Sequence, residues 1–155
     1  MKITGEQGIG KILKVFLQVC FYSGIIILVG LPFILNKLGF NLGASMYVIY
    51  PNGIVLLMIT HKFINLFNSL RLNTPFCERN VRLLKITGII SLIGSVFWLM
   101  DFLYEIFLAK STDIVFNSTL LFLCILFFGV SIALYILSEL FKQATEYKKE
   151  NDLTI

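Results

Sequence analysis

The side chains that could do chemistry are few in this chain and lie far apart along it. His61 is the only histidine, which excludes a multi-histidine metal site. Next to Lys62, this ring is expected to face lipid headgroups at a membrane interface. The sequence contains no nucleophile–base pair, no glycine-rich phosphate loop and no zinc-ligand spacing. We therefore expect a protein that is not an enzyme and that uses no metal and no other cofactor.

Three carboxylates lie close together in the second half of the chain. Asp101 and Glu105 are four residues apart, which places them on one face of a helix, and Asp113 follows shortly after. They form either the solvated end of a helix or the cation-entry site of a transporter. No ionisable residue lies in the middle of an apolar segment, so the sequence does not predict a buried proton relay.

The composition indicates that membrane-spanning helices position these residues. Hydrophobic residues make up 57% of the 155 residues and charged residues 14%, whereas a soluble domain carries about 25% charged residues. The chain has 15 phenylalanines and one tryptophan, which favours a surface in contact with lipid. A span needs about 20 residues, so four spans and short connections use nearly the whole chain.

Four apolar segments are long enough to cross a bilayer, at residues 15–35, 42–60, 84–108 and 114–138. The second contains Pro51, Asn52 and Gly53, which are expected to kink or locally unwind it. The fourth continues without a breaker, so one helix is expected to leave the membrane. We predict an all-α fold: a single membrane domain, residues 1–155, forming a transmembrane four-helix bundle with a cytoplasmic loop at 61–83 and a cytoplasmic helical tail at 139–155.

The distribution of basic residues predicts the orientation of these spans. With the N-terminus inside, the inner segments hold three basic residues before the first span, five between the second and third, and three after the fourth. These are Lys2, Lys11 and Lys14; Lys62, Arg71, Arg79, Arg82 and Lys85; and Lys142, Lys148 and Lys149. The outer segments hold only Lys37 and Lys110. Because basic residues near span ends stay in the cytoplasm, both termini are predicted to be cytoplasmic, in a multi-pass protein of the cell membrane.

The same asymmetry accounts for the net charge of +4 and the pI near 9.0 without any contact to nucleic acid. Cys20 and Cys124 lie within spans and Cys77 lies in the inner loop, so no disulfide is expected.

Small residues within the third and fourth spans indicate close helix packing. Gly88, Ser91 and Ser95 share one face of the third span, and Gly129 with Ala133 forms a small-xxx-small step in the fourth. These faces pack either within one bundle or between copies of the chain in a homo-oligomer.

The segment between the second and third spans has the signals of a helix start. Thr74 is a suitable N-cap and Pro75 a suitable first helical residue. Glu78 in the first turn can pair with Arg82 at i+4. This inner surface is either a docking site for a cytoplasmic protein or an anchor on lipid headgroups.

Two segments resemble the DUF2975 family of small bacterial membrane proteins of unknown function. The first runs Asn73-Thr74-Pro75-Phe76, then Asn80-Val81-Arg82-Leu83-Leu84, then Ile86 and Gly88. The second is the acidic tail, residues 150–155, ending in Leu-Thr-Ile. Size and the four-span layout are similar too. Leu84 stands where relatives often have another basic residue.

The resemblance implies a partner, because members of that family are often encoded beside a small helix-turn-helix DNA-binding protein. We therefore expect a membrane protein that binds and regulates such a cytoplasmic transcription regulator. The alternative is an oligomeric small transporter, channel or exporter-associated subunit with Asp101 and Glu105 at its outer mouth. The expected partner-binding residues are Asn73, Thr74, Pro75, Phe76, Arg79, Asn80, Arg82, Asp152, Leu153, Thr154 and Ile155.

Overall fold

The described part of the chain forms four helices, in the order α1 (Ile9–Lys37), α2 (Leu42–Arg71), α3 (Glu78–Phe107) and α4 (Ile114–Leu153). The computed structural model describes residues 9–37, 42–71, 77–108 and 113–153, and over these residues it contains no strand. Within the helices, side chains are described except those of residues 9, 35, 42–49, 70, 71, 152 and 153. The all-α fold predicted from the sequence is confirmed.

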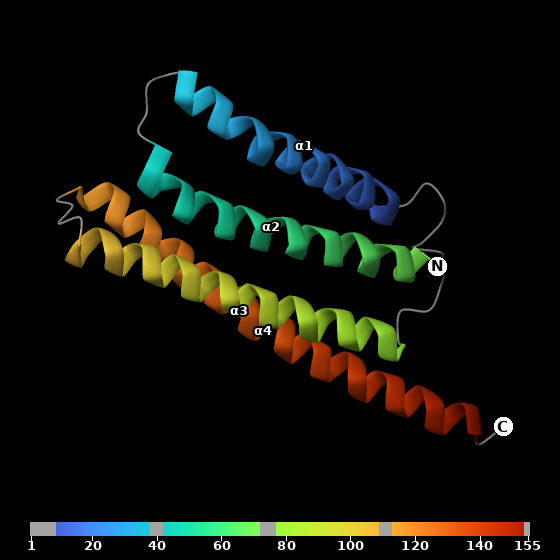
Figure 1. Ribbon diagram of the computed structural model, residues 1–155. Helices are drawn as coiled ribbons and strands as arrows, with labels where there is room; N and C mark the ends of the chain where they lie inside the picture. Colours follow the sequence, from blue (N-terminus) through green and yellow to red (C-terminus); the bar gives the residue numbers. More distant parts are fainter. Residues whose placement is uncertain (1–8, 38–41, 72–76, 109–112, 154–155) are drawn as a thin grey trace.

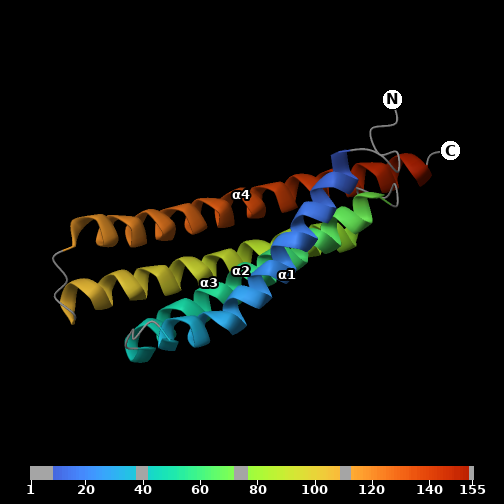
Figure 2. The ribbon, with the colours of Figure 1, turned by 90° about the horizontal axis from the view of Figure 1, so that it is seen from above.

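Consecutive helices run in opposite directions, so the start of α3 and the end of α4 lie at the same end of the molecule (Figure 1). Over the described residues, the backbones approach each other only between α1 and α2, α2 and α3, and α3 and α4, with the most extensive approach between α3 and α4. The helices therefore form an open array, with α1 and α4 at its two edges. Figure 2 shows the same array from above, with α4 separated from α1 over most of its length.

α3 lies between α2 and α4 and packs against both. One core cluster joins Val55 of α2, Ile90 of α3 and Phe127 of α4. The second, nearer the start of α3, is built from the same three helices. Its buried members are Leu66, Leu84 and Leu134. These clusters fix the position of the first turns of α3, which line the site described below.

The contact between α3 and α4 depends on small residues. The Ser91 hydroxyl of α3 donates to the Phe127 carbonyl at 2.8 Å, and the Ser131 hydroxyl of α4 donates to the Gly88 carbonyl at 2.8 Å. A Cβ on Gly88 would lie 3.3 Å from the Ser131 carbonyl oxygen, so the absence of a side chain permits this approach. Gly88, Ser91 and Ser95 are all buried, which confirms the predicted packing face of α3.

The small-xxx-small step of α4 does not pack within the chain. Gly129 and Ala133 are exposed, and a Cβ added to Gly129 would meet nothing within 4 Å. Ser131 and Leu134, on another face of α4, make the contact with α3 instead, because they point toward the Gly88 side of that helix.

The start of α3 differs from the sequence prediction. The helix begins at Glu78, not at Pro75, because Cys77 has an extended backbone with φ −143° and ψ 152°. The Cys77 carbonyl accepts the first backbone hydrogen bonds, from Asn80 at 3.0 Å and Val81 at 3.3 Å. Thr74 and Pro75 themselves lie outside the described residues. α4 has a side-chain cap, since the Asp113 carboxylate accepts the Phe116 N–H at 3.1 Å.

Pro51 does not unwind α2, which is one continuous helix through Pro51, Asn52 and Gly53. Neighbouring helices hold this segment. The Asn52 amide donates to the Asp101 carboxylate of α3 at 2.7 Å, and Gly53 lies against the Leu28 side chain of α1. The predicted local unwinding is therefore wrong.

Among the described residues, three helices are long and apolar enough to cross a membrane, at Gly10–Ile34, Glu78–Phe107 and Ile114–Asn151. α2 is not among them over its described residues, which include Asn52, His61 and Lys62. α4 is 40 residues long, or about 60 Å at 1.5 Å per residue, roughly twice the thickness of a hydrocarbon core. It confirms the predicted unbroken helix that continues beyond an apolar segment.

Candidate functional site

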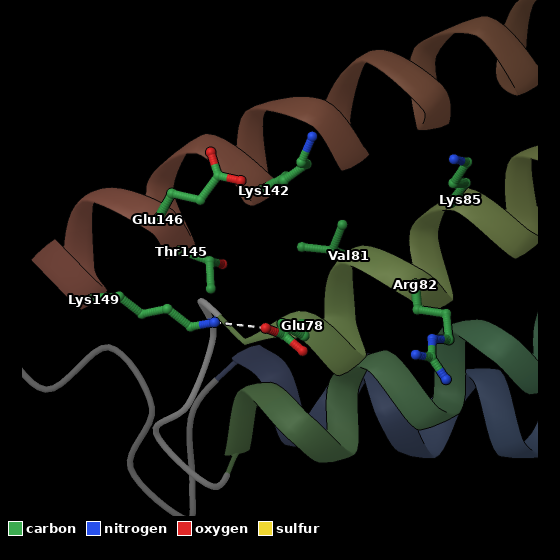
Figure 3. Close-up of a pocket in the computed structure, with 8 residues that line it drawn as sticks. All are labelled: Glu78, Val81, Arg82, Lys85, Lys142, Thr145, Glu146 and Lys149. Carbon is green, nitrogen blue, oxygen red and sulfur yellow. Dashed lines mark hydrogen bonds and ion pairs between the residues drawn. The ribbon is translucent and has the colours of Figure 1, made fainter.

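A charged groove lies between the first turns of α3 and the last turns of α4 (Figure 3). Its volume is about 360 Å³, which is within the usual range of roughly 300–1,000 Å³ for ligand pockets. The lining residues are Glu78, Val81, Arg82 and Lys85 of α3 and Lys142, Thr145, Glu146 and Lys149 of α4. Four basic and two acidic side chains therefore give this groove a positive net charge.

An ion pair joins the two helices at the end of the charged groove where α3 begins. The Lys149 ammonium of α4 donates to the Glu78 carboxylate of α3 at 2.6 Å, across 71 positions of sequence. The sequence predicted Arg82 as the partner of Glu78, and the structure places Lys149 there because the antiparallel packing brings the end of α4 to the first turn of α3. Both side chains are exposed, so the pair adds little to the stability of the fold.

Both members of this pair lie beyond the apolar parts of their helices and shift each other's titration. The hydrogen bond and positive charge of Lys149 hold the pKa of the Glu78 carboxyl below its usual value. The hydrogen bond and negative charge of Glu78 raise the pKa of the Lys149 ammonium. At neutral pH the pair is therefore fully charged.

The opposite end of the charged groove is its more basic part, with Lys85 from α3 and Lys142 from α4 (Figure 3). We call it the basic end of the groove. The Lys142 ammonium lies 3.5 Å from the Glu139 carboxylate one turn earlier in α4, in an exposed pair. The Lys85 ammonium lies 5.9 Å from the centre of the Tyr135 ring, within reach of a cation–π interaction. This end of the groove can bind an anion through ammonium and guanidinium groups.

The predicted partner-binding residues near the start of α3 separate into two groups. Arg79 and Arg82 are exposed, and of these two Arg82 lines the charged groove. Asn80 is fully buried, with 0% of its surface exposed, so it lies within the protein and not on the surface that a partner would meet. Its backbone N–H helps to start α3.

The other predicted partner-binding residues cannot be placed in the site. Asn73, Thr74, Pro75, Phe76, Thr154 and Ile155 lie outside the described residues. Asp152 and Leu153 belong to the last turn of α4, and their side chains lie outside the described part of the chain.

Two of the acidic residues at the other end of the array make hydrogen bonds within the chain. Asp101 accepts the hydrogen bond from Asn52, and Asp113 caps α4, while Glu105 is half-buried. The ring of His61 lies 5.6 Å from the ring of Phe21 in α1. Over the described residues, no three His, Cys, Asp or Glu side chains are grouped to hold a metal ion.

Sequence reasoning did not find most of the charged groove. Lys142, Glu146 and Lys149 follow each other at intervals of four and three residues in α4, and Glu78, Arg82 and Lys85 do so in α3. This spacing places each set on one face of its helix. The spacing therefore indicates a charged face on each helix, but it does not indicate that the two charged faces meet in one groove.

The sequence profile of one family, described as "Protein of unknown function (DUF2975)", matches residues 42–155 of the chain. The matched region comprises α2, α3 and α4 and all residues of the charged groove. No curated protein and no solved structure matches the chain.

Proposed function

Since the chain belongs to the DUF2975 family, we propose that it is a multi-pass membrane protein whose cytoplasmic end binds and regulates a cytoplasmic transcription regulator of the helix-turn-helix type. Four crossings with both termini inside place the charged groove in the cytoplasm. The regulator docks on the exposed start of α3 and the last turns of α4.

Four crossings are supported by the arrangement of the helices. α2 has 30 residues, about 45 Å, and lies between α1 and α3. Neighbours on both sides cover part of its surface, which makes polar groups such as Asn52 tolerable at membrane depth. The region where α3 starts and α4 ends is rich in basic residues, as expected for the cytoplasmic end. These are Arg79, Arg82, Lys85, Lys142 and Lys149.

The observation that carries the docking proposal is the length of α4 together with the charged groove. About 60 Å of continuous helix is more than one crossing requires. Its last turns lie against the start of α3, where Thr145 is buried and Lys149 pairs with Glu78. The surplus helix therefore presents a fixed, charged surface with exposed Arg79 and Arg82 beside it. Exposed arginines on a rigid element are frequent anchors of protein interfaces.

Capture of the partner tests this proposal. The tagged chain is purified from its native cells in mild detergent and the bound proteins are identified by mass spectrometry. We expect a small DNA-binding protein, reduced about tenfold by Arg82→Ala and by removal of residues 152–155. The matched control is Ile125→Ala, an exposed change in the apolar part of α4.

Unchanged recovery of the partner with both variants would contradict the docking surface. Recovery of only further copies of this chain or of transporter subunits would contradict the regulator. The orientation is tested by fusing either green fluorescent protein or alkaline phosphatase to the C-terminus. If the C-terminus is cytoplasmic, the green fluorescent protein fusion is fluorescent and the alkaline phosphatase fusion is inactive.

A further inference from the structure

A second groove lies between α3 and α4 next to the charged groove. It has a volume of about 340 Å³ and an almost entirely apolar lining. The residues that form it are Gly88, Ile89 and Leu92 of α3 and Ile132, Tyr135 and Ile136 of α4, with Ser131 at its floor. We call it the apolar groove.

The two grooves follow the same side of the helix pair. On α3, Arg82 and Lys85 line the charged groove, and Ile89 and Leu92 continue the same face at intervals of four and three residues. On α4, Ile132 and Tyr135 precede Lys142 on one face with the same spacing, through Glu139. The two grooves therefore follow one another along the same side of the α3–α4 pair.

Lys85 and Tyr135 mark the junction of the two grooves. Lys85 lines the charged groove, Tyr135 lines the apolar groove, and the ammonium lies 5.9 Å from the ring centre. On the α4 side the character changes at the same height, from Ile136 to Lys142. Tyrosine and lysine are the residues that occupy the boundary between hydrocarbon and headgroups.

We propose that the α3–α4 pair binds one anionic glycerophospholipid, with its phosphate at Lys85 and Lys142 and an acyl chain in the apolar groove. Basic residues at this boundary attract anionic headgroups, and Arg82 adds a third cation beside them. Glu139 offsets one of these charges, which leaves the basic end of the charged groove positive. The side chains along the apolar groove are half-exposed, Ile89 to 50% and Ile132 to 47%, so an acyl chain can lie against them.

A lipid fits the two grooves better than a free phosphate does, because a soluble anion would make no contact with the apolar groove. Gly88 lines the apolar groove one turn after Lys85, and its lack of a side chain permits the close contact between α3 and Ser131 of α4. This inference goes beyond the proposed docking of a regulator, and it is tested on the purified chain without any partner.

Native mass spectrometry of the purified chain with phosphatidylglycerol or phosphatidylcholine tests the headgroup site. We expect tighter binding of phosphatidylglycerol, and about 25-fold weaker binding after Lys85→Gln with Lys142→Gln, at roughly fivefold for each basic residue. The matched control is Arg79→Gln with Lys148→Gln, which removes the same charge at exposed positions outside the lining and is expected to change binding by less than about twofold. Equal losses in the two double variants, or no preference for phosphatidylglycerol, would overturn the site.

The acyl-chain groove has its own variants. Leu92→Ser with Ile132→Ser is expected to weaken phosphatidylglycerol binding about tenfold, and Ile93→Ser with Ile125→Ser, exposed positions outside both grooves, to leave it unchanged. Glycerol phosphate competes at the headgroup alone and should displace the lipid only at far higher concentration. Displacement at equal concentration, or no effect of the Leu92 and Ile132 changes, would show a simple anion pocket and overturn the lipid.

A measurement on the unaltered chain keeps the proposal testable if a variant fails to fold. A photoactivatable phosphatidylglycerol with the reactive group on its acyl chain should label peptides that contain residues 88–92 or 131–136. Labelling spread over all apolar helices, α1 included, would show ordinary contact with bulk lipid and would contradict a defined site.

Discussion

Between α3 and α4, two serine hydroxyls donate to backbone carbonyls of the other helix and a glycine permits the close approach, whereas α1 meets α2 through Leu28, Leu57 and the Phe21–His61 ring contact. The family match covers α2 to α4 and leaves α1 outside. α1 is also the helix with the least burial, since none of its most apolar window is buried. The comparison indicates that α2 to α4 form the unit in which the positions of helices are strictly defined.

The largest effect is expected from Gly88→Leu. The added side chain meets the Ser131 carbonyl oxygen and the Leu134 Cβ, and the backbone oxygen cannot move aside. We expect a loss of about 3 kcal/mol of stability or failure to fold, measured by thermal unfolding in detergent. Gly129→Leu is the control, because a Cβ there meets nothing within 4 Å. Equal destabilisation by the two changes would remove the special status of the α3–α4 contact.

A smaller effect is expected from Ser91→Ala combined with Ser131→Ala. The two hydroxyls donate across the helix pair, and their loss should cost about 1–2 kcal/mol in total. The same unfolding assay measures it. Ser118→Ala serves as the control because that hydroxyl bonds to the Val115 carbonyl of its own helix. If the control loses as much stability as the pair, the cross-helix bonds add nothing.

On the α1 side, Gly24→Ala should be tolerated. The new Cβ would lie 2.9 Å from Leu57 Cδ2, the flexible end of a side chain that can rotate away. We expect a change below about 1 kcal/mol, close to that of Gly30→Ala, where a Cβ meets nothing within 4 Å. A loss as large as that of Gly88→Leu would mean that α1 is packed as strictly as α4.

The smallest effect on stability is expected from Glu78→Gln. The pair with Lys149 is exposed, so the unfolding midpoint should shift by less than about 2 °C. The position of α4 should change more, with a broader distance distribution between spin labels at Arg79 and Lys148. Because Lys149 lowers the pKa of Glu78, the unaltered pair persists at neutral pH and is lost as the pH falls through that lowered pKa. A sharp distance in the Gln variant would show that the pair does not hold α4.

Much of the fold could be predicted because helices in an apolar chain depend on local signals. The continuous α4 follows from the absence of a breaker, and the buried face of α3 follows from the spacing of Gly88, Ser91 and Ser95. The start of α3 could not be predicted in the same way, because Thr74 and Pro75 are a better start by local rules than Cys77, which makes no side-chain cap hydrogen bond.

The candidate site was predicted only in part. Arg82 was identified from a local motif, and Asn80 was chosen by the same motif although its side chain is buried. Lys85, Lys142 and Lys149 were counted only as basic residues that set the orientation of the spans. Their role in one groove depends on which face of α4 meets α3, and no local pattern contains that information.

The sequence by itself determined that this is an all-helical chain with apolar segments of membrane length, since hydrophobicity and helix periodicity act over neighbouring residues. Only the tertiary structure decided that Glu78 pairs with Lys149, that Asn52 meets Asp101, and that a charged and an apolar groove lie between α3 and α4. These contacts join residues 49 and 71 positions apart. They depend on how closely two helices can approach, which the small side chains at the α3–α4 contact set.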